Sequence, residues 1–260
     1  MSTFLFDSIV FGPVRSRRLG VSLGINLLPV DRKVCSFNCI YCECGWTSCT
    51  AGTKATLPSR KEVYAALEKK LGEMKEQGRK PDVITSAGNG EPTLHPEFFG
   101  IIEDSIALRD RFFPTAKIAV LSNGTGLHRI KVREALKKVN MNILKVDSAF
   151  PETVRKLNQP QARYDLQEFE RYVKTFDGRF IIQTMFVRGE YLGEAIDNTV
   201  TAEVDAWLKV IDRLRPKSVM IYTIERDTPL GRNLRKVPAS ELKTIAARVE
   251  DLGIAASVSG

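Results

Sequence analysis

Three cysteines, Cys35, Cys39 and Cys42, stand close together near the start of the chain. Their spacing is C-x3-C-x2-C, and three such thiolates can ligate three irons of a [4Fe–4S] cubane. The fourth iron then has no protein ligand, and an open metal position is typical of a catalytic site rather than a structural one. The loop therefore predicts a metal centre that binds a second molecule.

S-adenosylmethionine (SAM) suits such an open iron, because its amino and carboxylate groups can chelate the metal. Chelation would bring the sulfonium of SAM within reach of an electron from the cluster. Cleavage would then release methionine and a 5′-deoxyadenosyl radical, which abstracts hydrogen from a substrate. The protein's part in this chemistry would be to position the cofactors and exclude water.

The remaining two cysteines, Cys44 and Cys49, leave other readings open. Zinc could replace the cluster if one of them supplied a fourth thiolate, because tetrahedral thiolate sites suit both metals. Tyr41, just before the third cysteine, and the barrel-like context favour the cluster. We expect Cys44 and Cys49 to be inert thiols, with an extra metal or hydrogen-atom donation as alternatives.

A glycine-rich turn, Gly88-Asn89-Gly90-Glu91-Pro92, follows a predicted strand. Glycine lets backbone groups approach a ligand closely, and Glu91 supplies a carboxylate that can bind an ammonium group. Most such turns only connect a strand to a helix. Opposite a three-cysteine loop, we interpret the turn as the site for the methionyl amino group of SAM.

Polar residues also mark the ends of the next two predicted strands. Ser122 and Asn123 could bind a ribose or a carboxylate, although both residue types are also favoured in turns and helix caps. Lys145 and Asp147 stand at alternate positions of an apolar strand, so both can face one side of the sheet. Such a charged pair is costly inside a barrel unless it is paired or functional, and we favour function.

Helices and strands alternate along the rest of the chain. Apolar residues at helical spacing predict helices over residues 61–77, 96–109, 130–139, 166–175, 204–214 and 240–252. Short apolar runs predict strands over residues 21–30, 82–87, 116–121, 143–146, 180–187 and 218–224. This α/β alternation implies a parallel sheet, whose site gathers at the carboxyl ends of the strands. Gln183 and Tyr222 lie within the later strands.

The overall composition is that of a globular protein. Of the 260 residues, 43% are hydrophobic and 27% are charged, which permits one large domain with a full core. No run approaches the ~18 apolar residues of a membrane span, and the N-terminus lacks the residue order of a signal peptide. We therefore expect a cytoplasmic protein without a membrane partner.

Positive charge is concentrated just before the cysteines, in Arg15, Arg17, Arg18, Arg32 and Lys33. The net charge of +8 is compatible with an anionic partner such as RNA, a nucleotide or a phosphorylated metabolite. We predict that the segment 15–18 receives an anionic part of the substrate. Alternatively, its arginines pair with carboxylates such as Asp31 or Glu43 and only hold the N-terminal hairpin against the barrel.

The cysteine loop and the glycine turn resemble the cluster-binding and SAM-binding motifs of the radical SAM superfamily, and the similarity extends over essentially the whole chain. Asn89 stands where the usual Gly-Gly-Glu-Pro motif has a glycine. Residues 11–20 and the triplet Asn158-Gln159-Pro160 resemble a narrower group, the Fe–S oxidoreductases related to wybutosine biosynthesis.

This resemblance implies a partial (β/α)6 barrel with an N-terminal hairpin extension. It implies one domain over residues 1–260, with residues 1–33 as the extension and residues 34–260 as the barrel. The implied ligands of the [4Fe–4S] cluster are Cys35, Cys39 and Cys42. The residues implied to surround SAM are Tyr41, Gly88, Asn89, Gly90, Glu91, Ser122, Asn123, Asp147, Gln183 and Tyr222. Among these, the Tyr41 backbone would lie near the adenine.

The substrate does not follow from the resemblance. An RNA base or nucleoside, a protein glycine as in glycyl-radical-enzyme activases, and a small metabolite all stay open, and the basic segment favours the first. A non-enzymatic iron–sulfur or zinc module would instead need a fourth cysteine ligand and no SAM turn. The reaction would also need an electron donor such as flavodoxin or ferredoxin.

Overall fold

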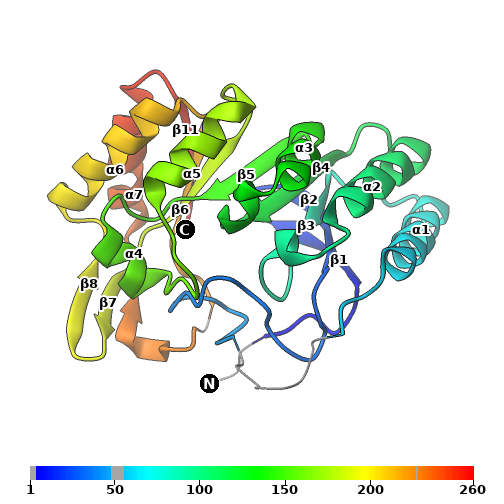
Figure 1. The fold of residues 1–260 in the computed structure, drawn as a ribbon, viewed down its shortest axis with the longest axis horizontal. Helices are drawn as coiled ribbons and strands as arrows, with labels where there is room; N and C mark the ends of the chain where they lie inside the picture. Colours follow the sequence, from blue (N-terminus) through cyan, green and yellow to red (C-terminus); the bar gives the residue numbers. More distant parts are fainter. Residues whose placement is uncertain (1–3, 48–55, 227) are drawn as a thin grey trace.

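The computed structural model describes residues 4–47, 56–226 and 228–260, so Cys49 lies outside the described residues. Eight strands form the main sheet in the order β1-β2-β3-β4-β5-β6-β9-β11. Only the first pair, β1 (Val10–Ser16) and β2 (Gly20–Ile25), is antiparallel, and each later neighbour is parallel. The sheet curls into an open half barrel, as Figure 1 shows, which confirms the predicted partial α/β barrel.

Most of the other elements agree closely with the sequence pattern, but helix α4 (Pro151–Leu157) and strand β11 (Ala255–Ser259) were not predicted. The remaining strands of the main sheet are β3 (Val83–Ser86), β4 (Lys117–Ser122), β5 (Met141–Lys145), β6 (Ile181–Met185), β9 (Ser218–Tyr222) and β11 (Ala255–Ser259). The helices are α1 (Arg60–Glu76), α2 (Phe98–Phe112), α3 (Ile130–Lys138), α4 (Pro151–Leu157), α5 (Leu166–Val173), α6 (Thr201–Leu214) and α7 (Ala239–Glu250). Helices α1 to α3 flank one half of the sheet, and α5 to α7 flank the other (Figure 1).

Helix α1 shows how local sequence sets an element. The Ser59 side chain accepts a hydrogen bond from Glu62 N, and the Glu62 side chain accepts one from the backbone N–H of Ser59, which completes a capping box. Val63, Leu67 and Leu71 recur at helical spacing and are buried against the sheet layer. The predicted helix over residues 61–77 is therefore confirmed.

The inner face of the half barrel is apolar at one level and polar at the next. Side chains of Val83, Ala119, Ile143, Ile181 and Met220 form one buried inner cluster. Residues two positions further along a strand face the same side, because side chains alternate with a period of two. Those next inner positions are Thr85, Leu121, Lys145, Gln183 and Tyr222, of which all but Leu121 carry a polar group. The polar level thus lies at the carboxyl ends of the strands, above an apolar floor.

Two further points concern the N-terminal segment and a second sheet. Strand β2 matches the strand predicted over residues 21–30; it lies within residues 1–33, the expected extension, and is the first strand of the parallel sheet. The parallel sheet therefore begins before residue 34, and β1 alone is the added hairpin strand. A second sheet, β10-β7-β8, was not predicted; it comprises β7 (Arg188–Tyr191), β8 (Glu194–Asp197) and β10 (Leu234–Arg235).

The missed hairpin has a physical explanation. Its two-residue turn consists of Leu192 and Gly193, with φ of 53° and 78°. Two positive φ values match the usual hairpin turn, but leucine is not the residue that normally signals it.

No helix in the described part of the chain is long and apolar enough to cross a membrane.

Candidate active site

The three predicted cluster ligands line one cavity of about 360 Å3 at the carboxyl ends of the strands. Backbone hydrogen bonds hold their loop on two sides. The N–H of Val34 donates to Asn89 O at 2.9 Å, and the N–H of Ile40 donates to Leu157 O, at the end of α4, at 3.0 Å. The cysteine loop is therefore fixed between the glycine turn and α4.

The contact between the glycine turn and the cysteine loop requires glycine. Gly90 has a φ of 137°, and a Cβ on it would lie 1.8 Å from Val34 O. A side chain at this position would push the two segments apart. Gly90 thus brings Glu91 and the cysteine loop to the same cavity.

The three thiols differ in their surroundings. Burial raises the pKa of Cys35 and of Cys39. A hydrogen bond from Cys44 outweighs burial and, with the ammonium of Lys33, lowers the pKa of Cys42 to about 5. Amide donors lie near two sulfurs: Asn123 Nδ2 is 3.7 Å from Cys35 Sγ, and Asn158 Nδ2 is 3.5 Å from Cys39 Sγ.

This donor set fits an iron–sulfur cluster, because soft thiolates with hydrogen-bond donors beside them are what such a cluster needs. Within residues 4–47, 56–226 and 228–260, no three His, Cys, Asp or Glu side chains are grouped closely enough to hold a single metal ion. Cys44 lies at the cavity too, with its Sγ 3.5 Å from Gly88 O.

Glu91 is 2% exposed and also lines the cavity. Its Oε1 accepts hydrogen bonds from Thr93 N at 3.1 Å, Thr93 Oγ1 at 2.6 Å and Ser122 Oγ at 2.8 Å. Oε2 accepts one, from Asn123 N at 2.7 Å. Burial raises the pKa of Glu91, and these donors partly offset that effect. A carboxylate oxygen has two lone pairs, so Oε2 can accept one further donor from the cavity.

Asp147 was predicted to lie at the cavity, but its side chain lies behind the cavity wall and does not line it. Its side chain is fully buried and accepts hydrogen bonds from Tyr41 Oη, from Asn158 Nδ2 at 2.6 Å and from Met185 N at 2.9 Å. Lys145, two residues earlier, does line the cavity and donates to Tyr222 Oη at 3.0 Å. Burial opposes the charge of Lys145, but Asp147 and Tyr222 outweigh it and raise its pKa.

Most of the other predicted cofactor-binding residues meet at this cavity. Eight line it: Tyr41, Gly88, Gly90, Glu91, Ser122, Asn123, Gln183 and Tyr222. Asn89 does not. Its side chain accepts from Phe6 N at 2.9 Å and donates to Phe6 O and Pro29 O at 2.8 Å, so it secures the N-terminal segment instead.

Several cavity residues were missed from the sequence, among them Phe37 and Met185. Met185 could have been found, because it stands two positions beyond Gln183 on the same strand and therefore faces the same side. Phe37 lies between the cysteines with no periodic pattern to show its direction. Lys33 was recognised only as one of several basic residues, yet it lies inside the cavity.

The basic segment separates into two kinds of arginine. Arg17 pairs with Glu225 at 3.0 Å on the surface, rather than with Asp31 or Glu43. Arg18 lines the cavity, with its guanidinium 4.3 Å from the centre of the Tyr222 ring. Its Nη1 is buried and has no hydrogen-bond partner among the described residues.

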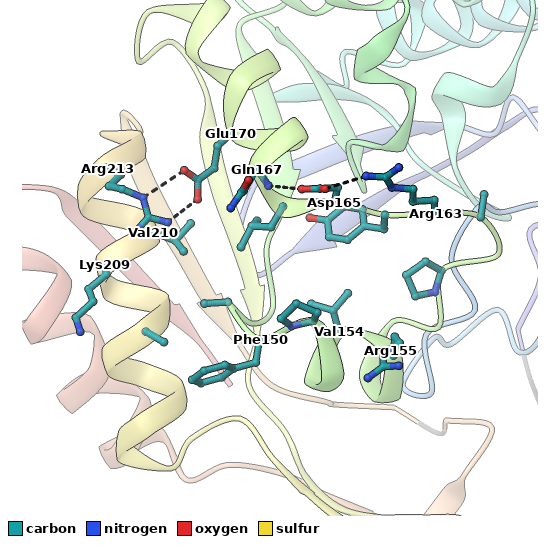
Figure 2. A pocket seen from close by; sticks show the side chains of 17 residues that line it. Phe150, Val154, Arg155, Arg163, Asp165, Gln167, Glu170, Lys209, Val210 and Arg213 are labelled. Atoms are coloured by element: carbon teal, nitrogen blue, oxygen red, sulfur yellow. Dashed lines mark hydrogen bonds and ion pairs between the residues drawn. The ribbon is translucent and has the colours of Figure 1, made fainter.

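A larger groove of about 830 Å3 lies among helices α4, α5 and α6. Figure 2 shows Glu170 and Arg213 on its wall, joined by an ion pair whose N···O distance is 2.6 Å. No cysteine is among its lining residues. The groove therefore lacks the donors for thiolate chemistry, and the smaller cavity is the candidate active site.

Comparison with known proteins agrees with this geometry. The model of the family described as "Radical SAM superfamily" matches residues 32–224. A UPF0026 protein of Helicobacter pylori is 30% identical over 225 residues, which cover 84% of this chain and 67% of that protein. A protein of Brachyspira hyodysenteriae named GTPase Obg is also 30% identical, over 84% of this chain but only 30% of its own length.

Solved structures share the fold. A radical SAM methyltransferase from Sphaerobacter thermophilus has a TM-score of 0.67 at 14% identity, over 92% of this chain and 65% of that one. Archaeal TYW1 has a TM-score of 0.53 at 11% identity, over 88% of this chain and 71% of that one. Because the family model spans most of the chain, the protein belongs to the radical SAM superfamily and is an enzyme that uses a [4Fe–4S] cluster and SAM.

Proposed function

We propose that Cys35, Cys39 and Cys42 ligate the cluster and that the cavity beside them holds SAM. The observation that carries this assignment is the meeting of three thiols and the Glu91 carboxylate at one cavity of about 360 Å3. When bound, the cluster and SAM supply the 5′-deoxyadenosyl radical that abstracts hydrogen from a substrate. Anaerobic reconstitution tests the proposal, because it requires ~4 irons per chain and reductant-dependent release of 5′-deoxyadenosine.

The remaining cavity residues are proposed to orient SAM. The free lone pair of Glu91 Oε2 would accept a hydrogen bond from the methionyl amino group, and Gly88 and Gly90 would let the backbone approach SAM closely. Ser122 and Asn123 hydrogen-bond Glu91 and would face the ribose or carboxylate region of SAM.

The other end of SAM is assigned in the same way. The Tyr41 backbone would lie near the adenine of bound SAM, and Gln183 and Tyr222, which line the same cavity, would contact SAM from later strands. Asp147 acts through its neighbours, because its hydrogen bonds position Tyr41 and Lys145 rather than a ligand.

Glu91→Gln is expected to weaken SAM binding by ~1–3 kcal/mol, the cost of losing a charge-assisted hydrogen bond to the amino group. Equilibrium dialysis with the reconstituted protein measures the effect. Glu97→Gln is the matched control, because Glu97 is an exposed carboxylate outside the cavity. Equal SAM affinity in wild type and Glu91→Gln, or loss of iron from Glu91→Gln, would refute the role.

We propose that the substrate carries an anionic group, such as the phosphate of RNA, a nucleotide or a phosphorylated metabolite. Arg18 supports this, because its stacked guanidinium lines the cavity and its buried Nη1 has no partner in the described part of the chain. A planar guanidinium can bind a phosphate through two parallel hydrogen bonds.

An electron donor such as flavodoxin or ferredoxin reduces the cluster, and we place the protein in the cytoplasm.

Arg18→Gln is expected to weaken the binding of adenosine monophosphate and inorganic phosphate by ~1–3 kcal/mol. Arg17→Gln should leave both affinities unchanged, because Arg17 forms a surface pair outside the cavity. Isothermal titration calorimetry at two salt concentrations measures both variants. Equal binding by the two variants, or no binding by wild type, would overturn the proposed contact.

A further inference from the structure

Lys33 is the most buried lysine near the cysteine loop. Its side chain lines the candidate active site, although the residue as a whole is only 3% exposed. A lysine is rarely buried to this extent unless it is paired, because an unpaired ammonium loses its hydration. Something in the cavity must therefore stabilise the charge of Lys33.

The protein supplies one neutral partner and several sulfurs. Lys33 Nζ donates to Gly45 O at 2.8 Å, just beyond the third cysteine. The thiols of Cys35, Cys39 and Cys42 line the same cavity as Lys33. Burial opposes the charge of Lys33, but these sulfurs outweigh it and raise the pKa of Lys33. Among the residues that the structure describes, Lys33 forms no ion pair with a carboxylate. The ammonium of Lys33 therefore shares one cavity with the three proposed ligand sulfurs and has no carboxylate partner among the described residues there.

The backbone around Lys33 makes this position rigid. The next residue, Val34, is paired through its backbone with the glycine turn on both sides, to Asn89 O and from Glu91 N. The bond from Nζ to Gly45 O connects the start of the cysteine loop to its end. Lys33 therefore has two separable features, a hydrogen bond that closes the loop and a charge among the thiols.

We infer that Lys33 sets the reduction potential of the cluster held by Cys35, Cys39 and Cys42. A fixed positive charge beside the ligands favours the state with one more electron, and burial limits its screening by solvent. Lys33 thus acts through the cluster ligands, without touching substrate, by making the cluster easier to reduce. This role rests on the proposed function, since it requires the three thiolates to carry the cluster.

The experiment compares Lys33→Met and Lys33→Gln with wild type in a redox titration followed by electron paramagnetic resonance. Both variants remove the charge, and the glutamine retains a donor for Gly45 O. At the same solution potential, both are expected to show about tenfold less reduced relative to oxidised cluster, which is about 59 mV for a one-electron couple. Arg17→Met is the control, because it removes a half-exposed charge that solvent screens, and its potential should equal wild type.

Iron and sulfide are measured first in every protein, so that the two proposals fail separately. A wild type without iron would refute the cluster assignment itself. Loaded variants with the wild-type potential would overturn the inference about charge. Iron could instead be lost from Lys33→Met but not from Lys33→Gln, with the potential of Lys33→Gln unchanged. That result would show that Lys33 acts only through its hydrogen bond to Gly45 O, and it would overturn the inference. Loss of iron from both variants and from the charge-retaining Lys33→Arg would show a steric role and would equally overturn the inference.

Discussion

Replacing Cys39 with alanine is expected to abolish the cluster, with iron falling from ~4 per chain to near zero and SAM cleavage lost. Cys39 is buried in the loop that lies between the glycine turn and α4. A solvent molecule therefore cannot take the place of its thiolate as an iron ligand. Cys35→Ala and Cys42→Ala should have the same effect. Iron and sulfide assays after anaerobic reconstitution, with 5′-deoxyadenosine measured by chromatography, check the expectation.

Cys44→Ala is the informative control for this series. Cys44 also lies at the cavity and hydrogen-bonds Cys42, so the structure places it nearer to the site than the sequence suggested. If three thiolates leave the required open iron, Cys44→Ala and Cys49→Ala retain the cluster. Loss of iron from Cys44→Ala as complete as from Cys39→Ala would mean four protein ligands and would refute the open site.

Asp147→Ala is expected to lower the free energy of unfolding by about 3–5 kcal/mol, the cost of removing one partner from a buried charge pair. The change leaves Lys145 without its carboxylate and removes the acceptor for Tyr41, Asn158 and Met185 N. Urea unfolding of the reduced protein without iron measures this effect apart from the cofactors.

Asp104→Ala serves as the matched control, because Asp104 pairs with Arg60 in a partly exposed ion pair at 2.7 Å. Pairs of that kind contribute roughly 0–1 kcal/mol. Equal destabilisation by the two substitutions would show that the Asp147 network has no special weight. The double variant Lys145→Met, Asp147→Leu should recover part of the loss, since it leaves no unpaired buried charge.

The sequence alone determined the half barrel, because both of its signals are local. Apolar spacing in residues 60–76 and capping by Ser59 specify α1 whatever it packs against. The predicted strands correspond to β2, β3, β4, β5, β6 and β9, and their order places polar residues at one end of the sheet. The C-x3-C-x2-C spacing likewise predicted the cluster, because all three cysteine ligands fall within eight consecutive residues.

Only the tertiary structure decided which polar side chains reach the cavity. Asn89 lies between two glycines that line it, yet its amide binds Phe6, more than eighty residues away in the chain. Arg17 and Arg18 are adjacent, but one pairs with Glu225 and the other stacks on Tyr222. Such directions depend on partners that are distant in sequence. Local periodicity therefore predicts which strand ends meet, whereas long-range packing selects the side chains that act there.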